Sequence, residues 1–484
     1  MKDAALINDI SVLSRSLGFI PDDIKPLAES GSSRKYYRVF SGPRTLIGTY
    51  NANVEENEAF FYLTQHFSQH QLPVPNLLAV NDSRTCYLQT DYGDDTLFHH
   101  VKQAVEAGRY DEKTIDLFRK TLNQLVLFQV KGHEGLDYNK VYPTPCFDRS
   151  GVMDDLDYFK YYFVKPHAEI VFNEMRLKAE FQRFAEEACQ AKNDYFMYRD
   201  FQSRNVMIYQ DNPYFIDYQG GRKGPLPYDV VSLLYQVKAQ MPQALRDELL
   251  EYYKKALSAY VDLESVEFDK YYPQFVYLRL MQVLGAYGFR GLIQKKAHFI
   301  ESIPYALQEL TTWSETHPLP NYPELESVIQ QLRPLLQRYP SPLTSHLSPL
   351  TSPLTVTINS FSYRKGYPDD FSGNGGGFVF DCRALPNPGR EPEFKTKTGR
   401  DWEVVEYLLA KPPVHEFLDH VKAIVSQSID NYLERHFSHL MVSFGCTGGQ
   451  HRSVFFAQSI ADWIRATYPS VNVKLNHREQ DIHE

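Results

Sequence analysis

The hydrophobic pattern of the first 335 residues changes once, near residue 93. Between residues 25 and 90, short apolar stretches are separated by glycine and proline, which is typical of strands joined by turns. The expected strands are residues 25–29, 36–40, 45–50 and 85–89, with a helix at 55–71. From about residue 95 onward, apolar residues recur at helical spacing. The expected helices there are residues 97–107, 112–131, 153–163, 177–192, 228–238, 243–263, 271–290 and 298–316, with strands and a loop at 194–217.

A low-complexity segment, in which the letters S-P-L-T recur, occupies residues 341–355. Frequent proline excludes a helix and small polar side chains cannot build a core, so we expect an exposed interdomain linker. In the last quarter of the chain, an apolar strand at 439–444 passes through a glycine-rich turn into a helix at 454–467. The expected organisation is a small lobe at 1–93, a large lobe at 94–335, a linker at 336–356 and an α/β domain at 357–484.

Composition narrows the classes of function. The chain of 484 residues has 43% hydrophobic and 23% charged residues, as an ordinary soluble globular protein of two or three domains does. Its net charge of −9 argues against a mainly electrostatic nucleic-acid or membrane binder. The five cysteines are scattered, and no stretch is typical of a signal peptide or a bilayer-spanning helix. We therefore expect a cytoplasmic protein with reduced thiols.

The chemically informative stretch lies at residues 198–219. Asp200 and Asn205 stand on one expected loop, and Asp217 follows across a hairpin with its turn at 211–213. Phosphoryl transfer needs a carboxylate beside the attacking hydroxyl, and oxygen ligands for the magnesium ion that bridges the nucleotide phosphates. The spacing therefore predicts a kinase site in which Asp200 is the catalytic base and Asn205 and Asp217 are metal ligands.

At these residues the chain resembles the aminoglycoside phosphotransferase-like kinases. Within them it is most similar to the anomeric kinases of bacterial cell-wall sugar recycling, which phosphorylate N-acetylmuramate or N-acetylglucosamine at C1. The resemblance covers roughly residues 8–335 and includes the loop ending Ser203–Arg204–Asn205, the I-D-Y-Q run at 216–219 and the helix start at 227–234. It implies a two-lobed protein-kinase-like fold, ATP and Mg²⁺ as cofactors, and a hydroxyl of a sugar or amino sugar as the acceptor.

The same resemblance extends to the nucleotide-binding parts. Residues 31–36 correspond to the turn that covers the phosphates, and residues 88–94 to the hinge whose backbone meets adenine. The implied cofactor-binding residues are Ser32, Ser33, Arg34, Gln89, Asp91 and Tyr92.

The chain departs from the pattern of these kinases in two places. Tyr198 stands where they usually have histidine, and a tyrosine can still pack and orient the loop. The third expected strand has no lysine to contact the phosphates. Either Arg44, Lys35 or Arg34 substitutes, or the phosphates depend on magnesium and backbone amides. Glu58 is then expected to lack its usual ion-pair partner, and Asp229, near a helix start, to order the catalytic loop.

The glycine-rich turn at 445–453 predicts an anion site, because a strand that turns into a helix N-terminus gathers backbone N–H groups around one point. Arg452 can add a charged contact to the same anion. The spacing from Cys446 to Arg452 is similar to the phosphate loop of cysteine phosphatases, in which the cysteine attacks phosphorus. A wider resemblance, over nearly all of 357–480, is to the C-terminal domain of the RapZ-type RNase adapters.

That second resemblance rests on residues 360–366, 380–388, 398–399, 445–454 and 476–478. The domain of that family senses glucosamine-6-phosphate and binds a small regulatory RNA. The implied phosphosugar site consists of Asp381, Arg383, Thr447, Gly448, Gly449 and Arg452, with Arg364 and His477 as further members. RNA is the less favoured partner, because residues 357–484 hold 14 Lys and Arg against 16 Asp and Glu and RNA affinity needs clustered cations.

Three hypotheses follow from these observations. The first is a sugar 1-kinase with a regulatory, sugar-phosphate-sensing domain, and the intact Asp200, Asn205 and Asp217 favour it. The second is a non-enzymatic adapter that binds a metabolite or RNA and carries a degenerate kinase lobe. The third is a bifunctional kinase and phosphatase that uses Cys446.

Overall fold

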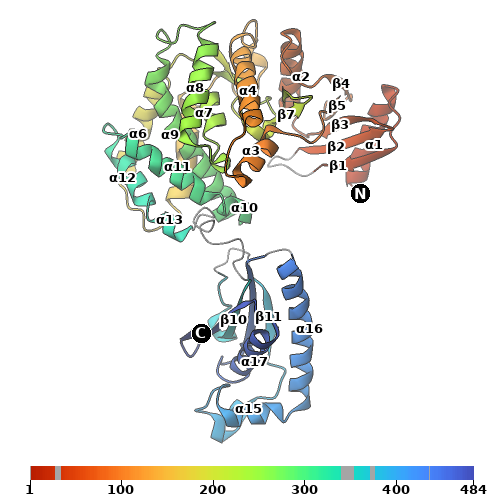
Figure 1. Cartoon of the computed structure of the whole chain (residues 1–484), viewed down its shortest axis with the longest axis vertical. Helices are drawn as coiled ribbons and strands as arrows, with labels where there is room; N and C mark the ends of the chain where they lie inside the picture. The colour runs from red at the N-terminus through yellow and green to blue at the C-terminus, as the bar shows by residue number, and fades with distance from the viewer. Residues whose placement is uncertain (1, 28–33, 340–353, 371–375, 435–436, 484) are drawn as a thin grey trace. The chain divides into compact units, whose positions relative to one another are not determined.

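The computed structural model describes residues 2–27, 34–339, 354–370, 376–434 and 437–483. The chain divides into two compact units, residues 1–340 and 341–484, and each has its own hydrophobic core (Figure 1). Residues 340–353, the greater part of the expected linker at 336–356, lie outside the described residues. Helix α13 (Leu335–Arg338) overlaps the start of the expected linker, and strand β10 (Thr355–Ser362) overlaps its end.

The first unit begins with an antiparallel five-stranded sheet in the order β1-β2-β3-β5-β4. Helix α1 (Lys2–Ser16) packs on it, with Ile10 in a small core beside Val39 and Leu88. Strand β4, which follows Pro73 and Pro75, is not among the expected strands. It is a strand because it pairs with β5, and that pairing is not visible in its own sequence. The strands are β1 (Asp23–Pro26), β2 (Lys35–Ser41), β3 (Arg44–Tyr50), β4 (Leu77–Val80) and β5 (Cys86–Thr90).

Helix α2 (Val54–Gln69) connects the small sheet to the large helical part of the unit. Its N-cap is Asn53, whose side-chain oxygen accepts a hydrogen bond from the backbone N–H of Glu56 at 3.2 Å. One face of the helix is buried, and the ring of Phe67 lies 5.1 Å from that of Phe128 and 5.0 Å from that of Phe196. The helix is therefore held by the main core, and the orientation of its first turn is set by that packing.

The rest of the first unit is mostly helical, as expected (Figure 1). The expected helix at 153–163 is α5 followed by a π-helical turn, and the one at 271–290 is α9, which also ends in a π-helical turn (Gly288–Ile293). No helix in the described ranges is long and apolar enough to cross a membrane. The α-helices are α3 (Leu97–Glu106), α4 (Glu112–Val130), α5 (Arg149–Phe159), α6 (Glu174–Ala188), α7 (Pro227–Leu234), α8 (Gln243–Leu257), α9 (Phe268–Tyr287), α10 (Ala297–Ile300), α11 (Ile303–Thr316), α12 (Pro323–Leu332) and α13.

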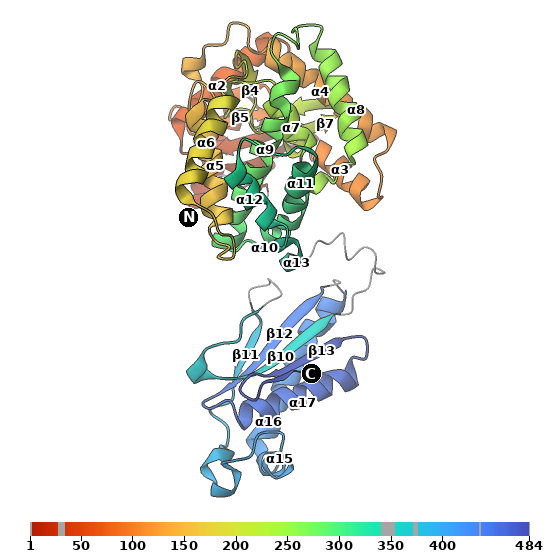
Figure 2. The same cartoon turned by 90° about the vertical axis from the view of Figure 1, so that its left-hand side faces the viewer.

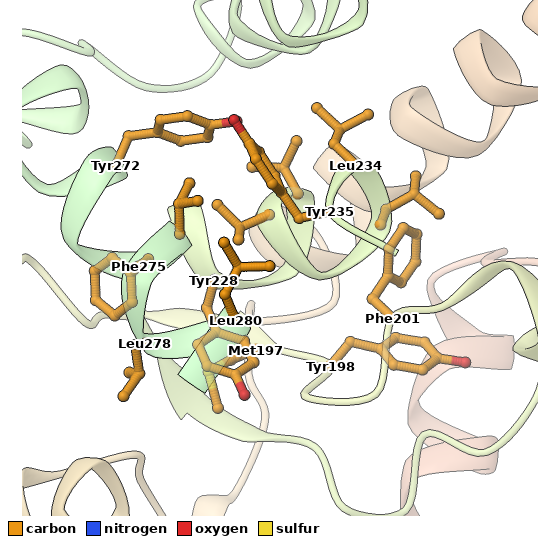
Figure 3. Packing of buried hydrophobic residues seen from close by; sticks show 14 of the residues in the cluster. Met197, Tyr198, Phe201, Tyr228, Leu234, Tyr235, Tyr272, Phe275, Leu278 and Leu280 are labelled. Atoms are coloured by element: carbon orange, nitrogen blue, oxygen red, sulfur yellow. The ribbon is translucent and has the colours of Figure 1, made fainter. Parts of the chain in front are cut away.

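Two short antiparallel sheets interrupt the helices: β6 (Tyr195–Met197) with β9 (Arg222–Gly224), and the hairpin of β7 (Val206–Tyr209) and β8 (Asn212–Phe215). The loop between β6 and β7 places two of its own rings, those of Tyr198 and Phe201, in the hydrophobic core (Figure 3). The Phe201 ring stacks on that of Phe215 with centroids 5.6 Å apart. This packing gives the loop a rigid base.

The second unit is an α/β domain with a five-stranded sheet in the order β11-β12-β10-β13-β14. Strands β11 (Phe378–Asp381), β12 (His439–Cys446), β10 and β13 (Asn472–His477) are parallel, and β14 (Ile482–His483) is antiparallel. Helices α16 (Pro412–Glu434) and α17 (Arg452–Thr467) share one core with the sheet, and α15 (Trp402–Leu409) precedes them (Figure 2). Because the strands are parallel, Asp381, Ser362 and Cys446 end at the same edge of the sheet.

Candidate active site

The loop that carries Asp200 is held from below by Asp229 on α7. The buried carboxylate of Asp229 accepts hydrogen bonds from the backbone N–H groups of Tyr198, at 2.7 Å, and Arg199, at 2.9 Å. Burial raises the pKa of Asp229 to about 7, while the two N–H groups favour its ionised form. The backbone of Arg199 is left-handed, with φ at 78°. Asp229 therefore orders this loop, as the sequence predicts.

Tyr198, which departs from the family pattern, is buried under the loop. Its hydroxyl donates to the backbone carbonyl of Ile216 at 2.5 Å, and its ring packs against Phe201 with centroids 5.2 Å apart. The tyrosine thus connects the loop of Asp200 to the residue that precedes Asp217. The prediction that Tyr198 packs and orients the loop is confirmed.

The structure brings Asp200, Asn205 and Asp217 together. The side-chain amide nitrogen of Asn205 donates to the backbone carbonyl of Asp200 at 2.8 Å and to Asp217 Oδ2 at 3.4 Å. With its nitrogen turned to these two residues, Asn205 keeps its amide oxygen for another contact. Asp217 lies in left-handed backbone, with φ at 69°, directly beyond the β7–β8 hairpin. Two oxygen donors therefore stand beside Asp200, which is the donor type that Mg²⁺ prefers.

Gln219 is a residue of this site that sequence reasoning did not single out as functional. Its Nε2 donates to Asp217 Oδ1 at 2.7 Å, and its side chain is buried. The hydrogen bond fixes the orientation of the Asp217 carboxylate. The glutamine of the I-D-Y-Q run was the available signal, because a residue two positions from a ligand can support it.

A buried ion pair fastens the loop to α5. The guanidinium of Arg199 contacts both carboxylate oxygens of Asp155, at 2.7 and 2.9 Å, and the hydroxyl of Tyr228. The Arg199 guanidinium also lies 4.9 Å from the Phe147 ring centroid. Arg199, the residue before Asp200 in the chain, thus connects the loop to the large lobe through Asp155.

On the small-lobe side, the carboxylate that reaches the site is that of Glu56. Glu56 Oε1 pairs with Arg34 Nη2 at 2.6 Å, and Arg34 Nη1 lies 3.3 Å from Asp217 Oδ1. Glu58 points elsewhere on the same helix and pairs with Arg84, with Nη2 and Oε2 2.6 Å apart. The hydrogen bond from Arg84 lowers the pKa of Glu58. Glu58 thus has no lysine partner on β3, as expected, and instead forms an exposed pair on the helix surface with Arg84 from the turn before β5.

The hinge residues are held by their side chains. The carboxylate of Asp91 accepts from Arg38 Nε at 2.7 Å and from the backbone N–H of Gly93 at 2.8 Å. Tyr92 stacks on Tyr214 with ring centroids 4.1 Å apart, and its hydroxyl donates to the carbonyl of Val74 at 3.2 Å. Gln89 is buried in β5. Part of the hinge backbone is engaged as well, since the Gly93 carbonyl accepts from Arg38 Nη2 at 3.0 Å. Ser32 and Ser33 lie outside the described residues.

The residues expected to bind a sugar phosphate in the second unit gather at the carboxyl edge of its sheet. Asp381 and Arg383 form an exposed ion pair, with Nη2 and Oδ2 2.7 Å apart, and the Arg383 guanidinium lies 4.1 Å from the Tyr363 ring centroid. The turn with Thr447, Gly448 and Gly449 follows β12. Gly449 has φ at +67°, a conformation that favours glycine.

Arg452 has a different environment from the one expected. Its side chain is buried, and Nη1 donates to the backbone carbonyls of Arg383, at 2.7 Å, and Leu385, at 2.9 Å. It therefore fastens the segment after β11 to the start of α17. Cys446 is also buried, with its Sγ 3.1 Å from the Ser453 hydroxyl. His477 is buried too, and its Nδ1 lies 3.0 Å from the Ser360 hydroxyl, whereas Arg364 is exposed.

Two protein families match the chain. Residues 23–268 match the phosphotransferase enzyme family, and residues 354–481 match the RapZ C-terminal domain. A nucleotide-binding protein of Pseudoalteromonas translucida is 40% identical over 128 residues, which is 26% of this chain and 43% of that protein. One from Paraburkholderia xenovorans is 38% identical over 131 residues, 27% of this chain and 41% of that protein. The chain thus spans less than half the length of these curated relatives.

Solved structures similar to the chain are kinases at low sequence identity. An amicoumacin kinase in complex with AMP-PNP, Ca²⁺ and Ami has a TM-score of 0.48 at 12% identity, covering 66% of this chain and 95% of that one. An ethanolamine kinase of Plasmodium vivax has a TM-score of 0.44 at 12% identity, covering 62% of this chain and 84% of that one.

Proposed function

The chain belongs to the phosphotransferase enzyme family, and on that premise we propose that it transfers the terminal phosphoryl group of ATP to a hydroxyl of a sugar or amino sugar. The observation that carries the proposal is the convergence of Asp200, Asn205 and Asp217, in which the amide group of Asn205 donates to the backbone carbonyl of Asp200 and to the carboxylate of Asp217. A degenerate lobe in a non-enzymatic adapter would have no need to keep a base and two oxygen donors in one place.

The proposed roles follow from the chemistry of each group. Asp200 accepts the proton of the acceptor hydroxyl as that oxygen attacks phosphorus. Asn205, through its amide oxygen, and Asp217, through its carboxylate, would hold Mg²⁺, which neutralises charge on the nucleotide phosphates when bound. Gln219 orients the Asp217 carboxylate for that role. Asp229, beneath the loop, keeps Asp200 in register with both metal ligands.

The nucleotide would lie between the hinge and the metal ligands. The hinge at Asp91 and Tyr92 is rigid, because Arg38 and Tyr214 hold its side chains. A rigid hinge backbone suits the hydrogen bonds that an adenine edge needs. Gln89, which is buried in β5, donates to the Thr49 hydroxyl on β3 at 3.5 Å. ATP is the proposed phosphoryl donor.

The acceptor class rests on the sequence resemblance to the anomeric kinases of cell-wall sugar recycling. We test it by an ADP-release screen over amino sugars, hexoses, aminoglycosides and choline, with NMR of the product. The expected result is turnover of an N-acetylated amino sugar to its 1-phosphate, which is lost in the Asp200→Asn variant. An absence of acceptor-dependent ADP release over the whole panel would contradict the proposal and favour the adapter hypothesis.

For the second unit, we propose a regulatory site for a phosphorylated amino sugar. The match to the RapZ C-terminal domain supports it, as does the edge of the sheet where Arg383 and the turn of Thr447, Gly448 and Gly449 lie together. An ammonium or hydroxyl group of the ligand would contact the exposed Asp381 carboxylate, which is paired with Arg383 in the structure. A glycine-containing turn before a 16-residue helix presents backbone N–H groups to an anion.

Calorimetry on the full chain tests this second proposal with glucosamine-6-phosphate as the probe. Arg383→Ala should weaken binding at least about tenfold, as the loss of a charged hydrogen bond does. Arg465→Ala, at the far end of α17, is the matched control and should leave the affinity unchanged. Arg452→Ala should also weaken binding about tenfold, with a loss of thermal stability because two carbonyls lose their donor. The absence of heat, or release of inorganic phosphate on mixing, would contradict it.

A further inference from the structure

The nucleotide site proposed above lacks the lysine that kinases usually have on the third strand. Between Arg44 and Tyr50, β3 carries no lysine, and Thr49 near its end is completely buried. The phosphates of a nucleotide nevertheless need a positive group besides the metal, because their charge develops further in the transition state. The question is which residue of this chain brings positive charge to that place.

We propose that Arg34 is the residue that contacts the nucleotide phosphates, delivered from the start of β2 and held in place by Glu56. The proposal rests on the proposed kinase function and specifies one residue of its site. Arg34 joins the two parts of the site: its guanidinium lies 2.6 Å from Glu56 on α2 and 3.3 Å from Asp217 beyond the β7–β8 hairpin.

The strand register explains how Arg34 takes the place of a lysine on β3. Strands β2 and β3 are antiparallel, and Lys35 lies opposite Tyr50. The residue before Lys35 therefore lies beside Asn51, one position beyond the end of β3. Asn51 Nδ2 donates to Glu56 Oε2 at 2.9 Å, so the two carboxylate oxygens of Glu56 are held by Asn51 and Arg34. The cation therefore comes from the start of the neighbouring strand, and its partner on α2 is Glu56 and not the expected Glu58.

The other two candidate cations are less well placed. Arg44 is exposed at the hairpin between β2 and β3, at the opposite end of β3 from Tyr50, and its guanidinium lies 5.2 Å from the Phe19 ring centroid. Lys35 is the next residue after Arg34, and in an extended backbone consecutive side chains point to opposite faces of the sheet. Among the three candidates, the ion pairs to Glu56 and Asp217 are those of Arg34.

The environment of Arg34 is typical of a functional ion pair. Only 4% of its side-chain surface is exposed, whereas Glu56 is 26% exposed and Asp217 is 36% exposed. Removing an arginine from water costs free energy that its ion pairs recover incompletely, so a buried pair is a weak device for stability. The arrangement instead suits a guanidinium that is held in position for a phosphate group, with Glu56 as its permanent partner. The longer contact to Asp217 is the one that a phosphate oxygen can replace.

The experiment compares two ion pairs of the same helix. Arg34→Gln and Glu56→Gln change the proposed pair, and Arg84→Gln and Glu58→Gln change the exposed pair on the other side of α2 as matched controls. Binding of Mg-ATP and of adenosine is measured by calorimetry on the full chain. We expect Arg34→Gln to weaken Mg-ATP binding about 10- to 100-fold and to leave adenosine binding within twofold, while the controls change neither. Glu56→Gln should weaken Mg-ATP by a smaller factor.

Arg34→Lys keeps the charge and distinguishes a binding role from a structural one. It should retain more Mg-ATP affinity than Arg34→Gln. If Arg34→Gln does not fold, the binding of Mg-ATP and of adenosine is compared between Arg34→Lys and wild type instead. Equal losses for Mg-ATP and adenosine, or no loss for Mg-ATP, would overturn the assignment. A wild-type chain that binds Mg-ATP but phosphorylates none of the tested acceptors would contradict the proposed function and leave the Arg34 result valid. A wild-type chain that binds no Mg-ATP would overturn both.

Discussion

At the scale of single residues, the site depends on side chains whose hydrogen bonds fix the position of the candidate catalytic and metal-binding residues. Asp229 fixes two backbone N–H groups, Tyr198 ties its loop to the strand before Asp217, and Gln219 orients the Asp217 carboxylate. The hydrogen bonds that they form are 2.5 to 2.9 Å long. The reactive groups can therefore be tested one at a time, since the loop is held by other residues.

Asp200→Asn is the substitution that tests the base. Because asparagine cannot accept the proton, turnover should fall by about 10²- to 10⁴-fold. Nucleotide binding should persist, because the loop is held by Asp229. The measurement is steady-state turnover together with calorimetric ATP binding. Turnover within threefold of wild type would remove Asp200 from the role of base.

Asp217→Ala removes the carboxylate that accepts from three donors of the protein: Asn205, Gln219 and Arg34. Activity should be abolished, because magnesium would lose a ligand. A magnesium titration of ATP binding checks this without relying on turnover: the wild-type chain should bind ATP more tightly as magnesium is added, and the variant should not. Glu58→Gln, which changes a carboxylate outside the site, is the control. Normal turnover of the variant at low millimolar magnesium would show that the metal assignment is wrong.

At the scale of elements, α5 and α9 approach each other at Gly285, and the π-helical turns that continue them approach at Gly288. A Cβ on Gly285 would lie 2.7 Å from the backbone nitrogen of Phe159, and one on Gly288 would lie 2.1 Å from the carbonyl oxygen of Tyr162. Only hydrogen fits at these positions, so the two helices approach backbone to backbone. This close approach supports the buried side of α5, from which Asp155 reaches Arg199.

Gly288→Ala should therefore destabilise the first unit by about 1–3 kcal/mol, the usual cost of overpacking. Gly220→Ala is the matched control, since a Cβ there meets nothing within 4 Å, and it should leave the stability unchanged or slightly raised. Urea unfolding of both variants gives the difference in free energy. Equal stabilities would show that the close approach can relax around an added methyl group.

At the scale of the whole molecule, the described core residues form separate clusters in the two units. The clusters of the first unit span residues 10–335, and that of the second unit spans 354–475. Separate cores predict independent folding. A change in one unit should therefore leave the stability of the other intact.

Cleavage within residues 341–355 should release two folded fragments, because a segment of small polar residues and proline cannot build a core. Limited proteolysis with mass spectrometry identifies the site, and calorimetry of residues 1–340 and 341–484 made separately should reproduce the two transitions of the full chain. First cleavage elsewhere, or precipitation of the separated fragments, would indicate one integrated unit.

Much of the site could be predicted because it is local in the sequence. Asp200 and Asn205 share one loop, and Asp217 follows a hairpin. The turn of that hairpin is at Gln210 and Asp211 and not at the expected 211–213, because Asn212 and Pro213 pair with β7 as part of β8. Residue types that suit a tight turn and a metal ligand are visible in sequence order. The helical lobe could be predicted for the same reason, since helical periodicity is a local property.

The remainder could not be predicted, because it depends on residues distant in sequence. Strand β4 exists through its pairing with β5, and its own four residues carry no strand-like alternation. The partner of Glu58 is Arg84, which lies 26 positions away in a turn. Arg452 was expected to face an anion, but the carbonyls that it binds lie 69 and 67 positions away in the sequence.

The sequence by itself determined which side chains are the candidates for base and metal ligands, and where the chain divides into two units. These properties follow from residue type and short-range spacing. Only the tertiary structure decided which cation faces Asp217, because Arg34 and Asp217 are 183 positions apart and meet through the packing of α2 between the sheet and the helical core. A long-range contact of this kind is set by the whole fold, and no local pattern encodes it.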